Sequence, residues 1–159
     1  MSAYFILKYL HVIGATVLLG TGAGIAFFML MAHRGGRAQT IADTARTVVI
    51  ADFIFTTTAV IAQPITGYLL AREAGYKLTE GWIVLSLILY VVTGLFWLPV
   101  VWMQAKLRKL AAGAAAAGEP VPPAYHRLFR LWFAFGFPAF AAVLVIFWLM
   151  IARPSFRLF

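Results

Sequence analysis

The sequence contains no cysteine, which excludes a disulfide framework and any metal site built on thiolates. It also lacks the short motifs of common catalytic sites: no HExxH zinc motif, phosphate-binding loop, dinucleotide fingerprint or nucleophile elbow is present. Charged residues are scarce, at 11%, whereas a soluble domain averages about 25%. Together with an apolar fraction of 64%, this deficit predicts a polytopic membrane protein.

The net charge of +8 is best explained by the membrane. Lysine and arginine gather in cytoplasmic loops, where they face the anionic headgroups of the inner leaflet. The lipid bilayer is therefore the predicted partner of the basic residues, and nucleic acid is not.

Four apolar segments are long enough to cross a bilayer: residues 4–32, 47–71, 82–104 and 131–152. Each has about 22–29 residues, against the ~20 that a helix needs. Lipid offers no partner for unpaired backbone groups, so all four must be helices. No internal repeat is visible. The sequence therefore predicts an all-α, up-down four-helix transmembrane bundle, with residues 1–159 as one domain and polar connections at 33–46, 73–81 and 106–127.

The distribution of lysine and arginine predicts how the chain lies in the membrane. The first and third connections with their flanks carry Arg34, Arg37, Arg46, Lys106, Arg108, Lys109, Arg127 and Arg130. The opposite side carries Lys8, Arg72, Lys77, Arg153 and Arg157. Eight against five favours the first side as cytoplasmic. We therefore expect a multi-pass protein of the bacterial inner membrane with both termini outside the cytoplasm.

His11 is the candidate functional residue, because an ionisable side chain inside a spanning helix is costly and rare. It lies about seven residues, roughly 10 Å, inside the outer end of its helix. Gln63 and Tyr90 are expected at a similar depth on the second and third helices. Small residues beside His11, such as Gly14, leave room for a neighbouring helix or a flat cofactor. The imidazole can be a packing residue bonded to Gln63 or Tyr90, a haem or metal ligand, or part of a proton relay.

Two further features concern polar groups within the spans. Asp52 lies inside the second span, and Arg130 near the inner end of the fourth is expected to pair with it as a structural ion pair. Three prolines lie in the spans and each leaves a carbonyl without its helical donor, so that three carbonyls become available acceptors: Pro64 that of Val60, Pro99 that of Leu95 and Pro138 that of Ala134.

The other two histidines are His33 and His126, which are expected to meet at the inner surface. Two ligands alone would make a weak metal site. Because His11 lies in the outer half of the bilayer, the three histidines cannot form one site.

Three stretches carry a family resemblance: LKYLHVIGATVLLGTG in the first helix, WLPVVWMQAKLRKL at the end of the third, and RLFRLWFAFGFPAFAAVLVIFWLMIARP in the fourth. They resemble a bacterial four-helix integral-membrane family known only as a domain of unknown function (DUF2269-like). The opening is also distantly similar to the membrane protoporphyrinogen oxidase that binds haem b and to the copper-resistance D family. The similarity to the oxidase family implies that His11 is a haem ligand. A second axial ligand would be Tyr90, a methionine, Lys8, or His11 of a second copy in a homodimer.

Three functions follow as hypotheses. The first is a haem-b-associated or redox membrane protein, with His11 as ligand and Gln63 and Tyr90 beside the cofactor. The second is a non-catalytic accessory or assembly subunit that packs against a partner in a membrane complex. The third is a small solute or ion carrier with Asp52 and the layer of polar residues around His11 on its path. The sequence leaves open whether the protein is an enzyme.

Overall fold

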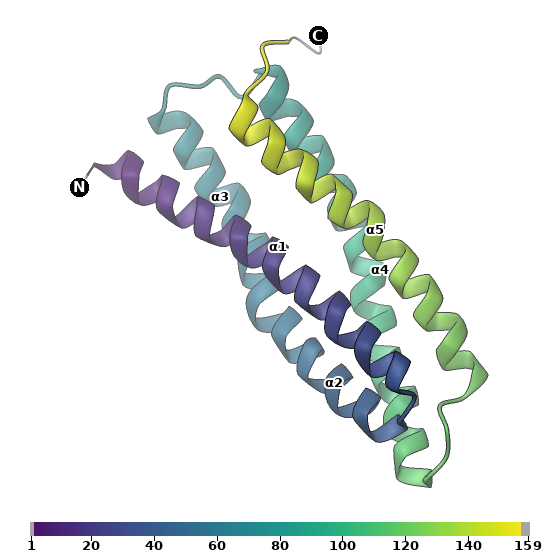
Figure 1. Ribbon diagram of the computed structural model, residues 1–159. Coiled ribbons are helices and arrows are strands. Elements are labelled where there is room, and N and C mark those ends of the chain that lie inside the picture. The colour runs from purple at the N-terminus through teal and green to yellow at the C-terminus, as the bar shows by residue number, and fades with distance from the viewer. Residues whose placement is uncertain (1, 157–159) are drawn as a thin grey trace.

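The structure, a computed structural model, describes residues 2–156 and is a bundle of long antiparallel helices (Figure 1). Its elements are α1 (Ala3–Gly35), α2 (Ala38–Ala51), the π-helix η1 (Asp52–Thr56), α3 (Thr57–Glu73), α4 (Gly81–Ala117) and α5 (Pro123–Ala152). α2, η1 and α3 run on as one span of 36 residues, Ala38–Glu73. Residues 2–156 contain no strand, and four helical spans are apolar enough to cross a membrane. The all-α four-helix membrane fold is confirmed.

Short, locally encoded breaks separate the spans. Ser2 caps the start of α1 by accepting a hydrogen bond from the backbone N–H of Phe5. Gly36 ends α1 with φ of 70° and Gly118 ends α4 with φ of 67°, a left-handed conformation that suits glycine. The prolines after Gly118 prevent α4 from continuing. Pro123 is the first residue of α5, where a backbone N–H would have no partner within the helix, so the missing N–H of proline costs nothing.

The polar stretches that the sequence analysis assigned to connections are largely helical. α2 begins at Ala38 and α4 continues to Ala117. The first and third connections are therefore only residues 36–37 and 118–122. The first stretch is an amphipathic helix whose buried residues recur at helical spacing: Ile41, Ala42, Ala45 and Val48. The other stretch, 106–117 at the end of α4, is rich in alanine, lysine and arginine, which are strong helix formers.

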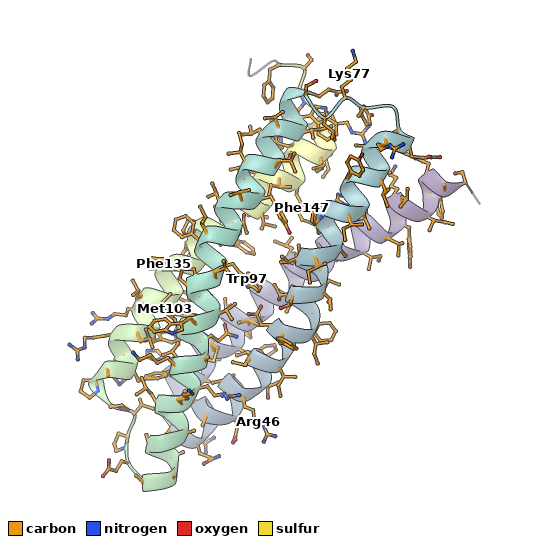
Figure 2. The ribbon with its side chains drawn as sticks, turned by 180° about the vertical axis from the view of Figure 1, so that it is seen from behind. Arg46, Lys77, Trp97, Met103, Phe135 and Phe147 are labelled. Atoms are coloured by element: carbon orange, nitrogen blue, oxygen red, sulfur yellow. The ribbon has the colours of Figure 1, made fainter. Side chains whose placement is uncertain are left out.

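The helices are longer than a membrane is thick. α1 has 33 residues and α4 has 37, which corresponds to about 50 and 55 Å, against a hydrocarbon thickness of about 30 Å. The polar turns of α2 and α4 lie at the end with the α1–α2 and α4–α5 connections, which we call the connection end. Arg46 lies near this end and Lys77 at the opposite one (Figure 2). The connection end is a helical stem with basic residues on its outside, such as Arg46, Lys106 and Lys109.

Packing differs between the two ends of the bundle. At the connection end, α1, α2, α4 and α5 enclose one core, whose most deeply buried side chains include Met29, Ile41, Leu107 and Tyr125. Towards the termini, α1 packs on α3 and α4 packs on α5, while α3 diverges from α4 (Figure 1). The π-helix η1 lies where this divergence begins. It follows α2, which packs closely on α4, and precedes α3, which does not.

Candidate site around His11 and Asp52

The half-buried His11 side chain joins α1 to α3 through a hydrogen bond of 3.0 Å between Nδ1 and Oγ1 of Thr66. The hydroxyl of Thr66 donates its single proton to the Ala62 carbonyl at 2.8 Å. With the hydroxyl proton assigned to this shorter contact, Oγ1 accepts from His11, which assigns the imidazole proton to Nδ1. Nε2 is left with its lone pair, and no residue within 2–156 hydrogen-bonds to it. This is the state of an imidazole that can accept a proton or bind a metal ion.

Two glycines allow α1 and α3 to approach closely around His11. A Cβ at Gly67 would lie 3.1 Å from Cε1 of the His11 ring. A Cβ at Gly14 would overlap with the amide nitrogen of Gln63. That amide donates to the backbone carbonyl of His11 at 2.9 Å. Each helix therefore offers one polar side chain to a glycine on the other, and the pairing fixes the register of α1 against α3.

The structure brings Gln63 to His11, but to its backbone and not to its ring. It does not bring Tyr90 there. The Tyr90 hydroxyl donates to the Val60 carbonyl, six residues before Thr66 on the same helix and thus about 9 Å along it. This carbonyl is the one that Pro64 leaves without a donor, so its predicted use as an acceptor is confirmed.

Thr66 and Gly67 were not identified from the sequence. They follow Gln63 by three and four residues and therefore lie on the same face of α3 as Gln63. That spacing was the available signal.

Asp52, the first residue of η1, is only 6% exposed. Its Oδ1 accepts a hydrogen bond of 3.4 Å from Nε1 of Trp97 on α4, which faces the α2–η1–α3 span (Figure 2). The structure does not bring Asp52 together with Arg130, which is exposed on α5. α5 packs on α4 and α1 and not on η1, so the two residues of the expected ion pair lie on helices that are not neighbours at this point.

His33 and His126 do meet at the connection end, with ring centroids 5.5 Å apart. The His33 ring stacks on Phe129 at 3.8 Å, within the aromatic packing of the stem. Among the described residues, no three histidine, aspartate or glutamate side chains gather into a metal-binding group. The side chains bonded to His11 within residues 2–156 are the hydroxyl of Thr66 and the amide of Gln63, so the imidazole is not part of such a group.

Four long apolar helices with isolated polar side chains between them define a polytopic integral membrane protein. The chain belongs to the family of predicted integral membrane proteins DUF2269, whose model matches residues 5–154. This match confirms the resemblance to the four-helix family of unknown function. No curated protein and no solved structure matches the chain.

Proposed function

We propose that the protein is a haem-associated membrane protein of the bacterial inner membrane, in which Nε2 of His11 is an axial ligand of haem b. The bonding of the imidazole supports the proposal, because its Nδ1–H is committed to Thr66 and its Nε2 lone pair is free. Histidines that bind metals almost always donate their other ring N–H to a fixed acceptor, which sets the tautomer and the ring orientation. Haem would supply one-electron redox chemistry. The chain would hold the iron and exclude water from it.

The residues around His11 limit where a second ligand can come from. Tyr90 and Gln63 are engaged in bonds elsewhere. Lys8 is exposed, with Nζ 5.7 Å from the centroid of the Tyr4 ring. Gly14 and Gly67 bring α1 and α3 too close for a porphyrin to lie between them. These facts favour His11 of a second copy as the second ligand, with one haem for two chains.

The absorption spectrum of detergent-purified protein tests the proposal. We expect a Soret band, and a pyridine haemochrome assay should give one haem per two chains. His11→Ala should abolish the band. His126→Ala is the matched control, because His126 is exposed at the opposite end of the bundle and should leave the spectrum unchanged.

One haem per chain would retain the role of His11 but contradict the second copy as ligand. Wild-type protein that carries no haem and takes up none on reconstitution would overturn the proposal. That result would favour the alternative, a non-catalytic accessory or assembly subunit of a membrane complex.

A further inference from the structure

The π-helix η1 points one carboxylate and one hydroxyl into the bundle and three apolar side chains outward. Asp52 and Thr56, one turn apart, are each 6% exposed. Phe53, Ile54 and Phe55 between them are at least half exposed, as lipid-facing residues are. Asp52 lies five residues inside the apolar stretch 47–71, next to these outward-facing apolar residues. Its carboxylate is therefore inside the protein at a depth where the surroundings are hydrocarbon.

Within residues 2–156, no lysine, arginine or histidine forms a salt bridge with this carboxylate. Its hydrogen-bond partner is the neutral indole of Trp97, at 3.4 Å, which is longer than an ordinary N–H···O bond. Oγ1 of Thr56 is also buried; it faces the Asp52 carboxyl but makes no hydrogen bond of ordinary geometry in the described structure. The site thus combines an acid without a counter-ion and a hydroxyl without an ordinary hydrogen bond, and both are more than nine-tenths buried.

The titratable groups on the helices around η1 lie at a distance or are engaged elsewhere. On α2 the nearest is Arg46, six residues or about 9 Å before Asp52 along the same helix. On α4, Lys106 lies 5.0 Å over the Trp102 ring, and the Tyr90 hydroxyl bonds to Val60. On α1, His11 bonds to Thr66, ten residues beyond Thr56. The remaining groups lie towards the helix ends: Tyr4, Lys8, Tyr9, His33, Arg34, Asp43, Tyr68, Arg72, Glu73, Arg108 and Lys109.

A buried carboxylate without a paired charge is strongly disfavoured in a medium of low dielectric constant, and one long hydrogen bond from a neutral donor does not offset that cost. The neutral acid avoids it. Protonation also supplies a donor, so the new O–H can bond to Oγ1 of Thr56, which has an unused acceptor. One proton therefore lets the acid donate to Thr56 while Oδ1 still accepts from Trp97.

We propose that Asp52 is a proton-binding site within the membrane that is occupied at neutral pH. In the occupied state, Oδ1 accepts from Nε1 of Trp97 and the protonated Oδ2 donates to Oγ1 of Thr56. Release of the proton leaves the carboxylate with its negative charge, and no electron transfer is involved. This site is independent of the proposed haem ligand, because it needs neither His11 nor a cofactor.

Labelling with dicyclohexylcarbodiimide tests the proposal, because this apolar reagent modifies protonated carboxyl groups within membranes. The purified wild-type protein in lipid vesicles is labelled over a range of pH and the modified peptides are identified by mass spectrometry. We expect Asp52 to be modified at neutral pH and the modification to decline as the pH rises. Asp43 is the matched control: it is exposed on α2, nine residues earlier, and should react only with a water-soluble carbodiimide.

Two substitutions separate the proton site from a merely structural acid. Trp97→Phe removes the donor that favours the carboxylate, so labelling should persist to higher pH. Thr56→Val removes the acceptor of the acid proton, so labelling should be confined to lower pH. Infrared spectra of the wild type should show a protonated carboxyl band that shifts in deuterated water. Absence of both that band and Asp52 labelling would overturn the proposal, and a shift to higher pH in Thr56→Val would contradict the role of Thr56.

Discussion

The hydroxyl of Thr66 accepts a hydrogen bond from Nδ1–H of His11 and donates its own O–H to the Ala62 carbonyl, so one side chain on α3 sets the tautomer of the imidazole on α1. Thr66→Val should leave Nδ1–H without an acceptor and lower the free energy of unfolding by about 1–3 kcal/mol. If haem is bound, its midpoint potential should change as well. Thr66→Ser keeps the acceptor and should resemble the wild type in thermal unfolding and potentiometric titration. Equal effects of the two substitutions would contradict the role of the hydroxyl.

Gly67→Ala should destabilise the bundle, because the added Cβ would meet the His11 ring at 3.1 Å in a closely packed contact. Overpacking of this kind costs about 1–3 kcal/mol. Gly22→Ala on α1 is the control, because a Cβ there would meet nothing within 4 Å. Thermal unfolding in detergent should show a lower transition for Gly67→Ala alone. The double variant Gly67→Ala with His11→Ala should recover part of the loss, since the ring that causes the overlap is gone.

Tyr90→Phe removes the donor that satisfies the Val60 carbonyl. Hydrogen bonds between membrane helices are worth about 0.6 kcal/mol on average, so we expect a small loss of stability. Pro64→Ala restores a backbone N–H that can bond to Val60 within the helix. In a Pro64→Ala background, Tyr90→Phe should therefore cost less than in the wild type. A double-mutant cycle with no coupling between the two positions would contradict the exchange of donors.

Arg130→Gln should have almost no effect on stability, because Arg130 is exposed and does not contact Asp52. Combined with Asp52→Asn, it should show additive effects within about 0.5 kcal/mol, as residues without shared contacts do. Chemical or thermal unfolding of the four members of this cycle gives the coupling directly. A coupling well above that limit would restore the ion pair that the sequence suggested.

The basic residues of the connection end should hold it in the cytoplasm. A fluorescent protein that folds only in the cytoplasm, fused after the last residue, is expected to stay dark. A phosphatase that is active only outside the cytoplasm should be active at the same position. The reverse pattern would place the helical stem on the non-cytoplasmic side of the membrane and His11 in the inner half of the bilayer.

Hydropathy was sufficient to find the four spans, because each contains enough consecutive apolar residues to cross a bilayer. It could not find the polar ends of the helices, since a helix in water needs only one apolar stripe, such as Ile41, Ala45 and Val48. The use of the Val60 carbonyl was predictable because proline acts on a carbonyl at a fixed spacing within its own helix.

Contacts between helices were harder to predict than contacts within them. The pairing of His11 with Thr66 depends on how α1 is rotated and shifted against α3, which no local pattern states. Asp52 was assigned to Arg130 by charge and depth alone. The actual neighbour, Trp97, follows from which helices are adjacent and from the π-helix that turns Asp52 towards α4.

The π-helix also has a consequence for insertions and deletions in this chain. The N–H of Thr57 bonds to the carbonyl of Asp52, five residues back, so this turn holds one residue more than an α-helical turn. Deleting one residue from 52–56 would let the span become a regular α-helix. Everything after it would then rotate by about 100° and shift by about 1.5 Å relative to α2. Gln63 and Thr66 would turn away from α1, so one extra residue near Asp52 sets the rotational phase on which the His11 contacts depend.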